Sequence, residues 1–235
     1  MNRKPFKFKQ FSIFQDKTAM KVGTDGVLLG AWATSNSGNT ILDIGTGTGL
    51  ISMMLAQRFP ESQIDAIEID ENAYYQAKEN FENVPFYNRL SIYLTSLQDY
   101  KTDKKYDLIV SNPPFFTVND LNEFDARKQA RQEETLTFSD LLEKTAQLLN
   151  KDGLASFIIP HDRMIEFCAI AAENALKVSK TTLIKGNETS PIKRVLLEFS
   201  FEQKEIEENT LTIEIERHRY TNDYINLTKA FYLKM

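Results

Sequence analysis

Residues 40–50 read Thr-Ile-Leu-Asp-Ile-Gly-Thr-Gly-Thr-Gly-Leu and predict a strand, a glycine turn and the start of a helix. The turn has the spacing Gly-x-Gly-x-Gly at Gly45, Gly47 and Gly49. Glycine permits unusual φ and a close backbone approach, so a ligand can lie against this main chain. A dinucleotide fingerprint instead has two residues before its third glycine. Asp43 beside the turn disfavours a pyrophosphate and favours a cationic or zwitterionic ligand.

The chain after this turn predicts a helix over 49–59 and a second strand over 63–70. Glu68 lies near the end of that strand, about twenty residues beyond the glycine turn, where an acid accepts hydrogen bonds from ribose hydroxyls in a βαβ unit. The alternative for Glu68 is a plain surface acid. Asp70 is placed to cap the helix that follows.

A second motif ends the strand predicted in residues 106–116, Tyr-Asp-Leu-Ile-Val-Ser-Asn-Pro-Pro-Phe-Phe. The apolar run in this stretch is typical of a strand buried on both faces. Pro113 and Pro114 stop the strand, because proline fixes φ and cannot donate to a sheet ladder. The result is a rigid platform that carries Asn112 and Phe115 at the carboxyl end of a strand, where open α/β sheets bind ligands. The alternative is a turn that only ends the strand.

Such a platform suits a planar nitrogen, as in adenine or a carboxamide. The lone pair of that nitrogen is delocalised, which makes it a poor nucleophile. The Asn112 oxygen and the Pro113 carbonyl would accept its two hydrogens and draw the lone pair out of the plane, and Phe115 would stack on the ring. Asn112 is uncharged, so it would orient and stabilise rather than act as a general base.

The remaining segments predict further elements and two more candidate contacts. Strands are expected over 89–94, 153–160, 178–184, 194–201 and 211–215, and helices over 138–149 and 162–176. Thr24 is a plausible N-cap of a short helix, and Lys21, Thr24 and Asp25 could instead form a lid over a ligand. The loop after strand 89–94 lies beside an adenine ring if a nucleoside occupies the crevice, and its candidates are Ser96, Leu97 and Asp99.

Composition limits the class of protein. The 235 residues suit one large domain, no apolar run approaches the length of a membrane span, and no signal peptide is recognisable. The single cysteine, Cys168, excludes a disulfide framework or a zinc cluster, and a cytoplasmic enzyme is expected. A net charge of −5 argues against nonspecific coating of nucleic acid, although basic residues cluster at 3–9, 127–131 and 193–194.

The order of these motifs resembles the class I S-adenosylmethionine-dependent methyltransferases over residues 20–201. The resemblance implies an α/β, Rossmann-like fold with a seven-stranded, mostly parallel sheet and an antiparallel C-terminal hairpin. It implies one domain over 1–235, with an N-terminal extension (1–35) and a C-terminal tail (202–235) packed on it. It implies S-adenosyl-L-methionine as cofactor, no metal, and Asn112-Pro113-Pro114-Phe115 as the amino-methylation motif, whose fourth place is commonly tyrosine. The implied cofactor-binding residues are Asp43, Gly45, Gly47, Gly49 and Glu68, joined by Asn112 and, from their positions, by Lys21, Thr24, Ser96 and Leu97.

A narrower likeness rests on four stretches: 21–32, Asn-Pro-Pro-Phe-Phe, Ala130-Arg131 and the Phe231-Tyr-Leu-Lys tail. They are similar to the bacterial tRNA-valine adenine-N6 methyltransferases, which modify the adenine on the 3′ side of the anticodon. This implies a tRNA partner, and a monomer is favoured. Alternatives are a protein glutamine N5-methyltransferase, another rRNA or DNA adenine-N6 methyltransferase, and a noncatalytic module that binds S-adenosylmethionine or RNA. Position and charge suggest phosphate contacts for Arg127, Lys128, Arg131, Lys193 and Arg194.

Overall fold

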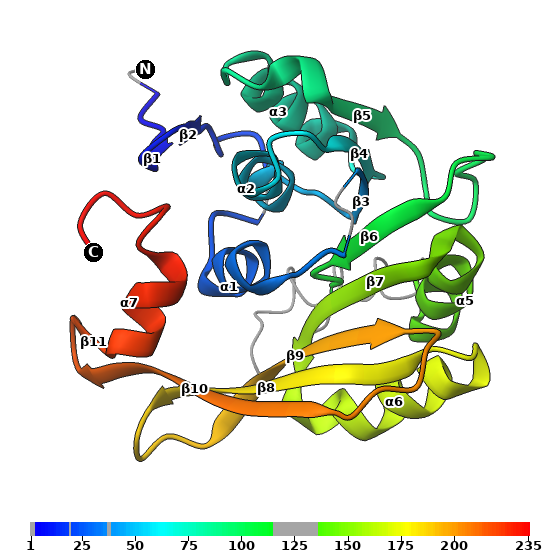
Figure 1. Cartoon of the computed structure of the whole chain (residues 1–235). Helices are drawn as coiled ribbons and strands as arrows, with labels where there is room; N and C mark the ends of the chain where they lie inside the picture. Colours follow the sequence, from blue (N-terminus) through cyan, green and yellow to red (C-terminus); the bar gives the residue numbers. More distant parts are fainter. Residues whose placement is uncertain (1–2, 19, 37–38, 115–135) are drawn as a thin grey trace, which may run out of the picture.

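A single mixed sheet organises the molecule. The computed structural model describes residues 3–18, 20–36, 39–114 and 136–235. Within these residues the central sheet has nine strands in the order β11-β10-β8-β9-β7-β6-β3-β4-β5, and β1 and β2 form a separate hairpin (Figure 1). The strands are β1 (Phe6–Lys7), β2 (Ser12–Ile13), β3 (Thr40–Ile44), β4 (Gln63–Glu68), β5 (Leu90–Leu94), β6 (Tyr106–Ser111), β7 (Leu149–Pro160), β8 (Lys177–Asn187), β9 (Ile192–Ser200), β10 (Glu207–Glu216) and β11 (Arg219–Tyr220).

Strand direction confirms the predicted fold class. Strands β3 to β7 pair in parallel, β9 runs antiparallel to β7, and β8 runs antiparallel to β9. β8 and β9 are therefore the expected C-terminal hairpin. This is the α/β Rossmann-like arrangement, with its carboxyl strand ends along one edge.

The sheet is wider than the seven strands expected. β10 adds in parallel to β8, and the two-residue β11 pairs with β10. The sequence predicts a short strand over 211–215, but β10 spans Glu207–Glu216. The residues of β10 before Leu211 are exposed, so this half of an outer strand lacks the apolar alternation that reveals strands in a sequence.

Helices cover both faces of the sheet. They are α1 (Thr24–Trp32), α2 (Leu50–Arg58), α3 (Glu71–Glu82), α5 (Phe138–Leu148), α6 (Met164–Glu173) and α7 (Asn222–Thr228). On one face, Leu42 and Ile44 of the sheet share a buried cluster with Phe167 of α6 and with α5. On the other face, Ile41 and Leu108 pack against α1 and α2 (Figure 1). The alternation of strand residues between these clusters is why the strands read as continuous apolar runs.

Of the two predicted helix caps, one is confirmed and one is wrong. Asp70 accepts a hydrogen bond from the Ala73 amide and caps α3 as predicted, and Thr137 caps α5 in a capping box with Asp140. The expectation that Thr24 caps α1 is wrong: the cap is Gly23, and Thr24 is the first helical residue, with no side-chain cap bond. Gly23 is extended and can precede the helix without a side-chain acceptor.

The two ends of the chain meet. The Lys9 amide donates to the Phe231 carbonyl at 2.8 Å, and Phe8 and Tyr232 form an antiparallel bridge. Phe231 is 1% exposed and packs in the cluster that holds Phe8 and α2. The C-terminal tail therefore lies against the N-terminal hairpin, on the α1 and α2 side of the sheet (Figure 1).

Candidate active site

The strand register brings the two sequence motifs together. Ile44, the last residue of β3, lies opposite Ile67 of β4 and Ser111 of β6. The residues that follow these three are Gly45, Glu68 and Asn112, so all three lie at the same carboxyl edge of the sheet. The Ser111 hydroxyl also donates to the Ile44 carbonyl at 2.8 Å and holds the ends of β3 and β6 together. The glycine turn and the Asn-Pro-Pro platform therefore lie at the same edge of the sheet.

The glycine turn has the backbone that its sequence predicts. Gly45, Gly47 and Gly49 have φ of 71°, 58° and 82°, which L side chains rarely adopt. A Cβ built on Gly45 or Gly47 meets no atom within 4 Å, whereas one on Gly49 would overlap the ring of Phe81. The first two glycines thus face open space above the turn, and the third permits close packing of α3 beneath it.

Asp43 supports the turn from below. It is fully buried at the end of β3, and its Oδ2 accepts bonds from the Thr46 hydroxyl at 2.6 Å, from the Ser52 hydroxyl at 2.6 Å and from the Ser52 amide at 3.1 Å. Burial raises the pKa of this carboxyl, and the bonds from Ser52 and Thr46 partly offset the shift. Among the described residues its Oδ1 is buried with no hydrogen-bond partner.

Glu68 links the end of β4 to the glycine turn through hydrogen bonds. Its Oε2 accepts from the Gly47 amide at 2.8 Å, and its Oε1 accepts from the amides of Ile69 and Asp70 at 2.9 Å each. Burial raises the pKa of Glu68, since it outweighs the lowering effect of these backbone bonds. A carboxylate has about four acceptor positions, so these three bonds leave capacity for a ligand hydroxyl.

These residues fit an adenosyl sulfonium cofactor. Gly45 and Gly47 leave backbone uncovered, Asp43 keeps a buried acceptor without a partner among the described residues, and Glu68 is a carboxyl group beside the turn. Ile69, directly after Glu68, is 50% exposed and adds an apolar side chain at this edge. Anionic and apolar groups in this order suit a ligand with a positive end, a ribose and a base.

The other residues predicted to contact the cofactor lie around this edge, and their side chains differ in solvent exposure. Lys21 and Thr24 are exposed at the start of α1. The Ser96 hydroxyl bonds to Asp99 at 2.7 Å in the loop after β5. The side chain of Leu97 is 4% exposed in the core, which leaves only its backbone for a ligand.

The platform is described as far as Pro114. Asn112 and Pro114 are partly exposed and Pro113 is buried. Phe115 lies outside the described residues, as do Arg127, Lys128 and Arg131. Lys193 is exposed near the start of β9. Arg194 forms an ion pair with Asp25 of α1 at 2.8 Å and lies opposite Pro160, so both basic residues are at the carboxyl edge of β7.

Several supporting residues were not predicted. Ser52 holds Asp43, and Asn80 of α3 donates to the Thr48 carbonyl of the turn and to the Phe14 carbonyl, each at 2.9 Å. In the sequence, Ser52 and Asn80 stand out only as polar residues on the buried face of a helix. This pattern does not show which groups their side chains contact.

A model of the methyltransferase small domain matches residues 17–168. The chain belongs to this methyltransferase family. It is a class I enzyme dependent on S-adenosyl-L-methionine. Among the described residues, no helix is long and apolar enough to cross a bilayer. The same residues contain no cluster of His, Cys, Asp or Glu that could hold a metal.

Relatives of nearly the same length carry one name, tRNA1(Val) (adenine(37)-N6)-methyltransferase. The protein of that name from Flavobacterium psychrophilum is 51% identical over 98% of this chain and 100% of its own, and the one from Flavobacterium johnsoniae is 50% identical with the same coverage. The one from Christiangramia forsetii is 46% identical over all of both chains.

Solved structures share the fold. A "predicted O-methyltransferase" from Agrobacterium tumefaciens has a TM-score of 0.69 at 17% identity, covering 88% of this chain and 96% of its own. The glycopeptide N-methyltransferase MtfA, solved with S-adenosyl-L-methionine, has a TM-score of 0.55 at 12% identity, covering 78% and 90%.

Proposed function

We propose that this enzyme transfers a methyl group to N6 of adenine 37, next to the anticodon, in the valine tRNA. The observation that carries the proposal is the pairing of Ile44 with Ser111, since it sets Asn112 beside the glycine turn. The names of relatives at 41–51% identity over nearly the whole chain support the same substrate.

Asn112 is the residue to which we assign the orientation of the amine. Its side-chain oxygen and the Pro113 carbonyl would accept the two N6 hydrogens, which makes the lone pair available on one face of the base. Two successive prolines fix this backbone, so little reorganisation is needed when the base arrives. Pro114 and Phe115 complete the motif, with Phe115 stacking on the ring.

The glycine turn and its neighbours would hold the methyl donor. When bound, S-adenosyl-L-methionine supplies a methyl group on a sulfonium that leaves as a neutral thioether. Glu68 would bind the ribose hydroxyls, and the buried Asp43 would add negative charge beneath the positive end. Gly45, Gly47 and Gly49 would keep the main chain close to the ligand, and Lys21, Thr24, Ser96, Leu97 and Asn112 are proposed at its rim.

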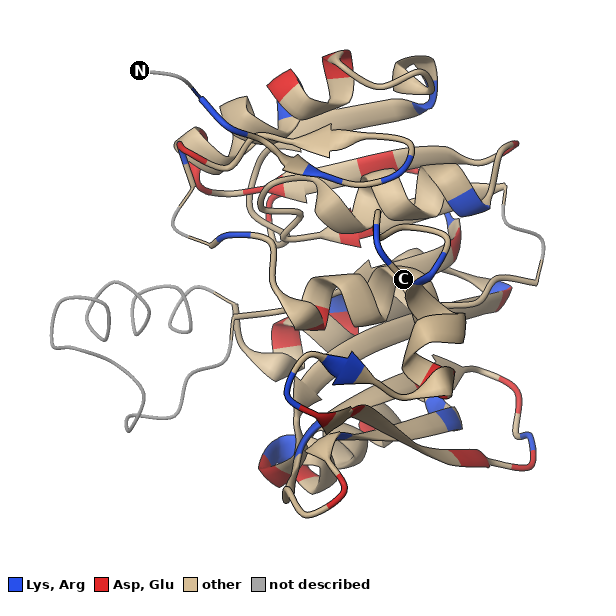
Figure 2. Ribbon diagram, turned by 90° about the vertical axis from the view of Figure 1, so that its left-hand side faces the viewer, with Lys and Arg blue, Asp and Glu red and all other residues tan. Residues whose placement is uncertain are grey.

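The proposed RNA partner would be held by local basic residues. Lys193 and Arg194 lie at the carboxyl edge, and Arg127, Lys128 and Arg131 remain predictions from the sequence. Figure 2 shows, among the described residues in this view, Lys and Arg interspersed with Asp and Glu. In this proposal a few phosphate contacts position the RNA, and contacts to the base at Asn112 supply the specificity. We further propose that the protein acts as a monomer in the cytoplasm, where tRNA is modified.

Mass spectrometry of nucleosides tests the function. Purified enzyme is incubated with methyl-labelled S-adenosyl-L-methionine and the valine tRNA, and the RNA is digested to nucleosides. The expected product is labelled N6-methyladenosine, absent when adenine 37 is replaced by guanine. Label in protein glutamine, or in another nucleoside, would overturn the assignment.

A further inference from the structure

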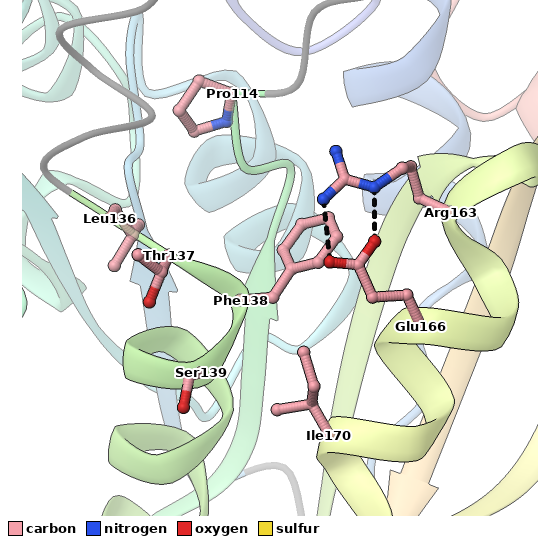
Figure 3. Close-up of a pocket in the computed structure, with 8 residues that line it drawn as sticks. All are labelled: Pro114, Leu136, Thr137, Phe138, Ser139, Arg163, Glu166 and Ile170. Atoms are coloured by element: carbon pink, nitrogen blue, oxygen red, sulfur yellow. Dashed lines mark hydrogen bonds and ion pairs between the residues drawn. The ribbon is translucent and has the colours of Figure 1, made fainter.

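Helix α3 contacts the glycine turn with two consecutive residues. The ring of Phe81 lies against Gly49, where a Cβ would overlap it. The side chain of Asn80 donates through Nδ2 to the Thr48 carbonyl at 2.9 Å. α3 packs on the same face of the sheet as α1 and α2, whereas the hollow next to Pro114 lies between α5 and α6 on the other face (Figure 3). α3 therefore supports two successive residues of the turn from the α1 and α2 side.

The same amide of Asn80 also holds the docked segment, residues 14–17. Its Nδ2 donates to the Phe14 carbonyl at 2.9 Å, and its Oδ1 accepts from the Phe14 amide at 2.8 Å. Asn80 therefore pairs with both backbone groups of Phe14, as a residue of a neighbouring strand would. The bond to the Thr48 carbonyl uses the second amide hydrogen, and the side chain is 0% exposed. One buried amide thus joins the docked segment to the glycine turn.

Gln76 holds the docked segment by a separate bond. It lies four residues before Asn80, on the same face of α3, and is also 0% exposed. Its Oε1 accepts from the Lys17 amide at 3.1 Å, and its Nε2 donates to Glu79 at 3.4 Å. Among the described residues, Gln76 therefore bonds to the docked segment and to its own helix, whereas Asn80 bonds to the docked segment and to the turn.

We propose that Asn80 is a positioning residue for S-adenosyl-L-methionine, which acts by coupling the docked segment to the glycine turn. The inference rests on the proposed cofactor site at the turn and adds to it a residue whose polar atoms bond to Phe14 and Thr48. Thr48 lies between two glycines, and glycine backbone adopts many conformations when nothing fixes it. The bond from Asn80 selects the one in which the turn is open to the ligand.

The coupling extends to residues proposed at the rim of the cofactor site. The Val22 amide donates to the Gln15 side chain at 2.7 Å, which ties the chain before α1 to the docked segment. Lys21 and Thr24, both proposed at the rim, lie on either side of Val22 in the chain. Because coupling between two sites is reciprocal, a cofactor that orders the turn also orders, through Asn80, the segment that leads to these rim residues.

Two alanine variants of α3 separate the turn from the docked segment. Asn80→Ala removes the bonds to both, and Gln76→Ala, equally buried, is the matched control that removes a bond to the docked segment. Each variant, the wild type and Gly45→Ala are titrated with S-adenosylhomocysteine by calorimetry, without RNA. Melting temperatures verify that the variants fold. Hydrogen exchange at the Phe14 amide is measured by NMR with and without the ligand.

The expected result is a loss of affinity that is specific to Asn80. Asn80→Ala should bind S-adenosylhomocysteine about tenfold more weakly, because the fitting conformation of the turn falls to about a tenth of the molecules. Gln76→Ala should stay within about twofold of the wild type, since its turn keeps the bond from Asn80.

Hydrogen exchange gives a readout that a loss of stability alone would not produce. In the wild type, S-adenosylhomocysteine should slow exchange at the Phe14 amide, which bonds to Asn80. In Asn80→Ala, the ligand should no longer slow it. The wild-type measurement needs no variant, so it tests the coupling even if Asn80→Ala does not fold.

Three outcomes would overturn the inference. The first is wild-type affinity in folded Asn80→Ala while Gly45→Ala binds more weakly. The second is an equal loss of affinity in Gln76→Ala and Asn80→Ala, as expected if α3 is only loosened. The third is exchange at the Phe14 amide of the wild type that the ligand does not change. Wild-type affinity in both Asn80→Ala and Gly45→Ala would overturn the proposed cofactor site as well, so the two failures are distinguishable.

Discussion

Gly45 and Gly49 share a turn and a positive φ but meet different surroundings. Alanine at Gly49 would combine backbone strain with overlap of the Phe81 ring, so we expect a loss of about 2–4 kcal/mol in the free energy of unfolding. Alanine at Gly45 has open space and should cost about 1 kcal/mol from strain alone. Urea unfolding of both variants measures the difference.

Cofactor binding should rank the same two variants in the opposite order. The Cβ of Gly45→Ala would occupy the space proposed for the ligand, so its affinity for S-adenosylhomocysteine should fall further than that of folded Gly49→Ala. Gly186→Ala, whose Cβ has its nearest neighbours at 3.6 and 3.9 Å, is the control. Equal stability of the Gly45 and Gly49 variants would contradict the packing described here.

Glu68 gives the site a pH dependence with a defined sign. Its folded pKa is raised above the ordinary 4.5 by burial, so the folded protein binds the proton more readily than the unfolded chain. Its contribution to stability therefore falls as pH rises from 4.5 through the raised pKa. Ribose hydroxyls need the carboxylate, so cofactor affinity should change the other way and weaken as pH falls through the raised pKa.

Calorimetric titration with S-adenosylhomocysteine from neutral pH down to 4.5 checks this expectation. Glu68→Gln should bind more weakly at neutral pH and show a smaller pH dependence, with the remainder attributable to Asp43, whose pKa burial also raises. Superimposable pH profiles of the wild type and Glu68→Gln would exclude Glu68 as the ribose acceptor.

At the residue scale, the sequence predicts where polar side chains lie better than it predicts which groups they bond to. The positions of Asp43, Glu68 and Asn112 could be predicted because each lies at or near the end of a buried strand, and the strand ends of a parallel sheet share one edge. Ser52 and Asn80 could not, since their bonds to Asp43 and Thr48 depend on how α2 and α3 pack. The Arg194–Asp25 pair joins residues far apart in the chain and was likewise unpredictable.

Elements with strong apolar runs were predicted within a few residues, and elements without them were not. β3, β4 and β6 are buried on both faces, so their sequences are diagnostic. β10 is an outer strand with mostly exposed side chains, and only its register with β8 shows that it belongs to the sheet.

The junction of the two chain ends makes a prediction at the same scale. Phe231→Ala would empty a site that is 1% exposed between the N-terminal hairpin and α2, and should reduce the free energy of unfolding by about 3–5 kcal/mol. Hydrogen exchange should also become faster at the Lys9 amide, which bonds to Phe231. Leu233→Ala, at a position 56% exposed, is the control and should change neither quantity. Unaltered exchange at Lys9 in the Phe231 variant would show that the two ends are independent.

For the whole molecule, the net charge of −5 requires that RNA be held by a few local contacts. Lys193→Ala, at the carboxyl edge, should raise KM for tRNA severalfold and reduce the slope of log affinity against log salt by about 1. Lys151→Ala, exposed at the opposite end of β7, is the matched control. Filter binding over a range of salt concentrations measures both slopes, and identical slopes would remove Lys193 from the RNA surface.

The account as a whole depends on Asn112 acting on a base held beside the glycine turn. The most direct measurement is single-turnover methylation of the valine tRNA by Asn112→Ala, together with its affinity for S-adenosylhomocysteine. We predict a rate about 10²–10³-fold below the wild type, because a preorganised polar contact to the reacting group is lost. Affinity should stay within about fivefold, the value of one hydrogen bond. A normal rate in the folded variant would contradict the account.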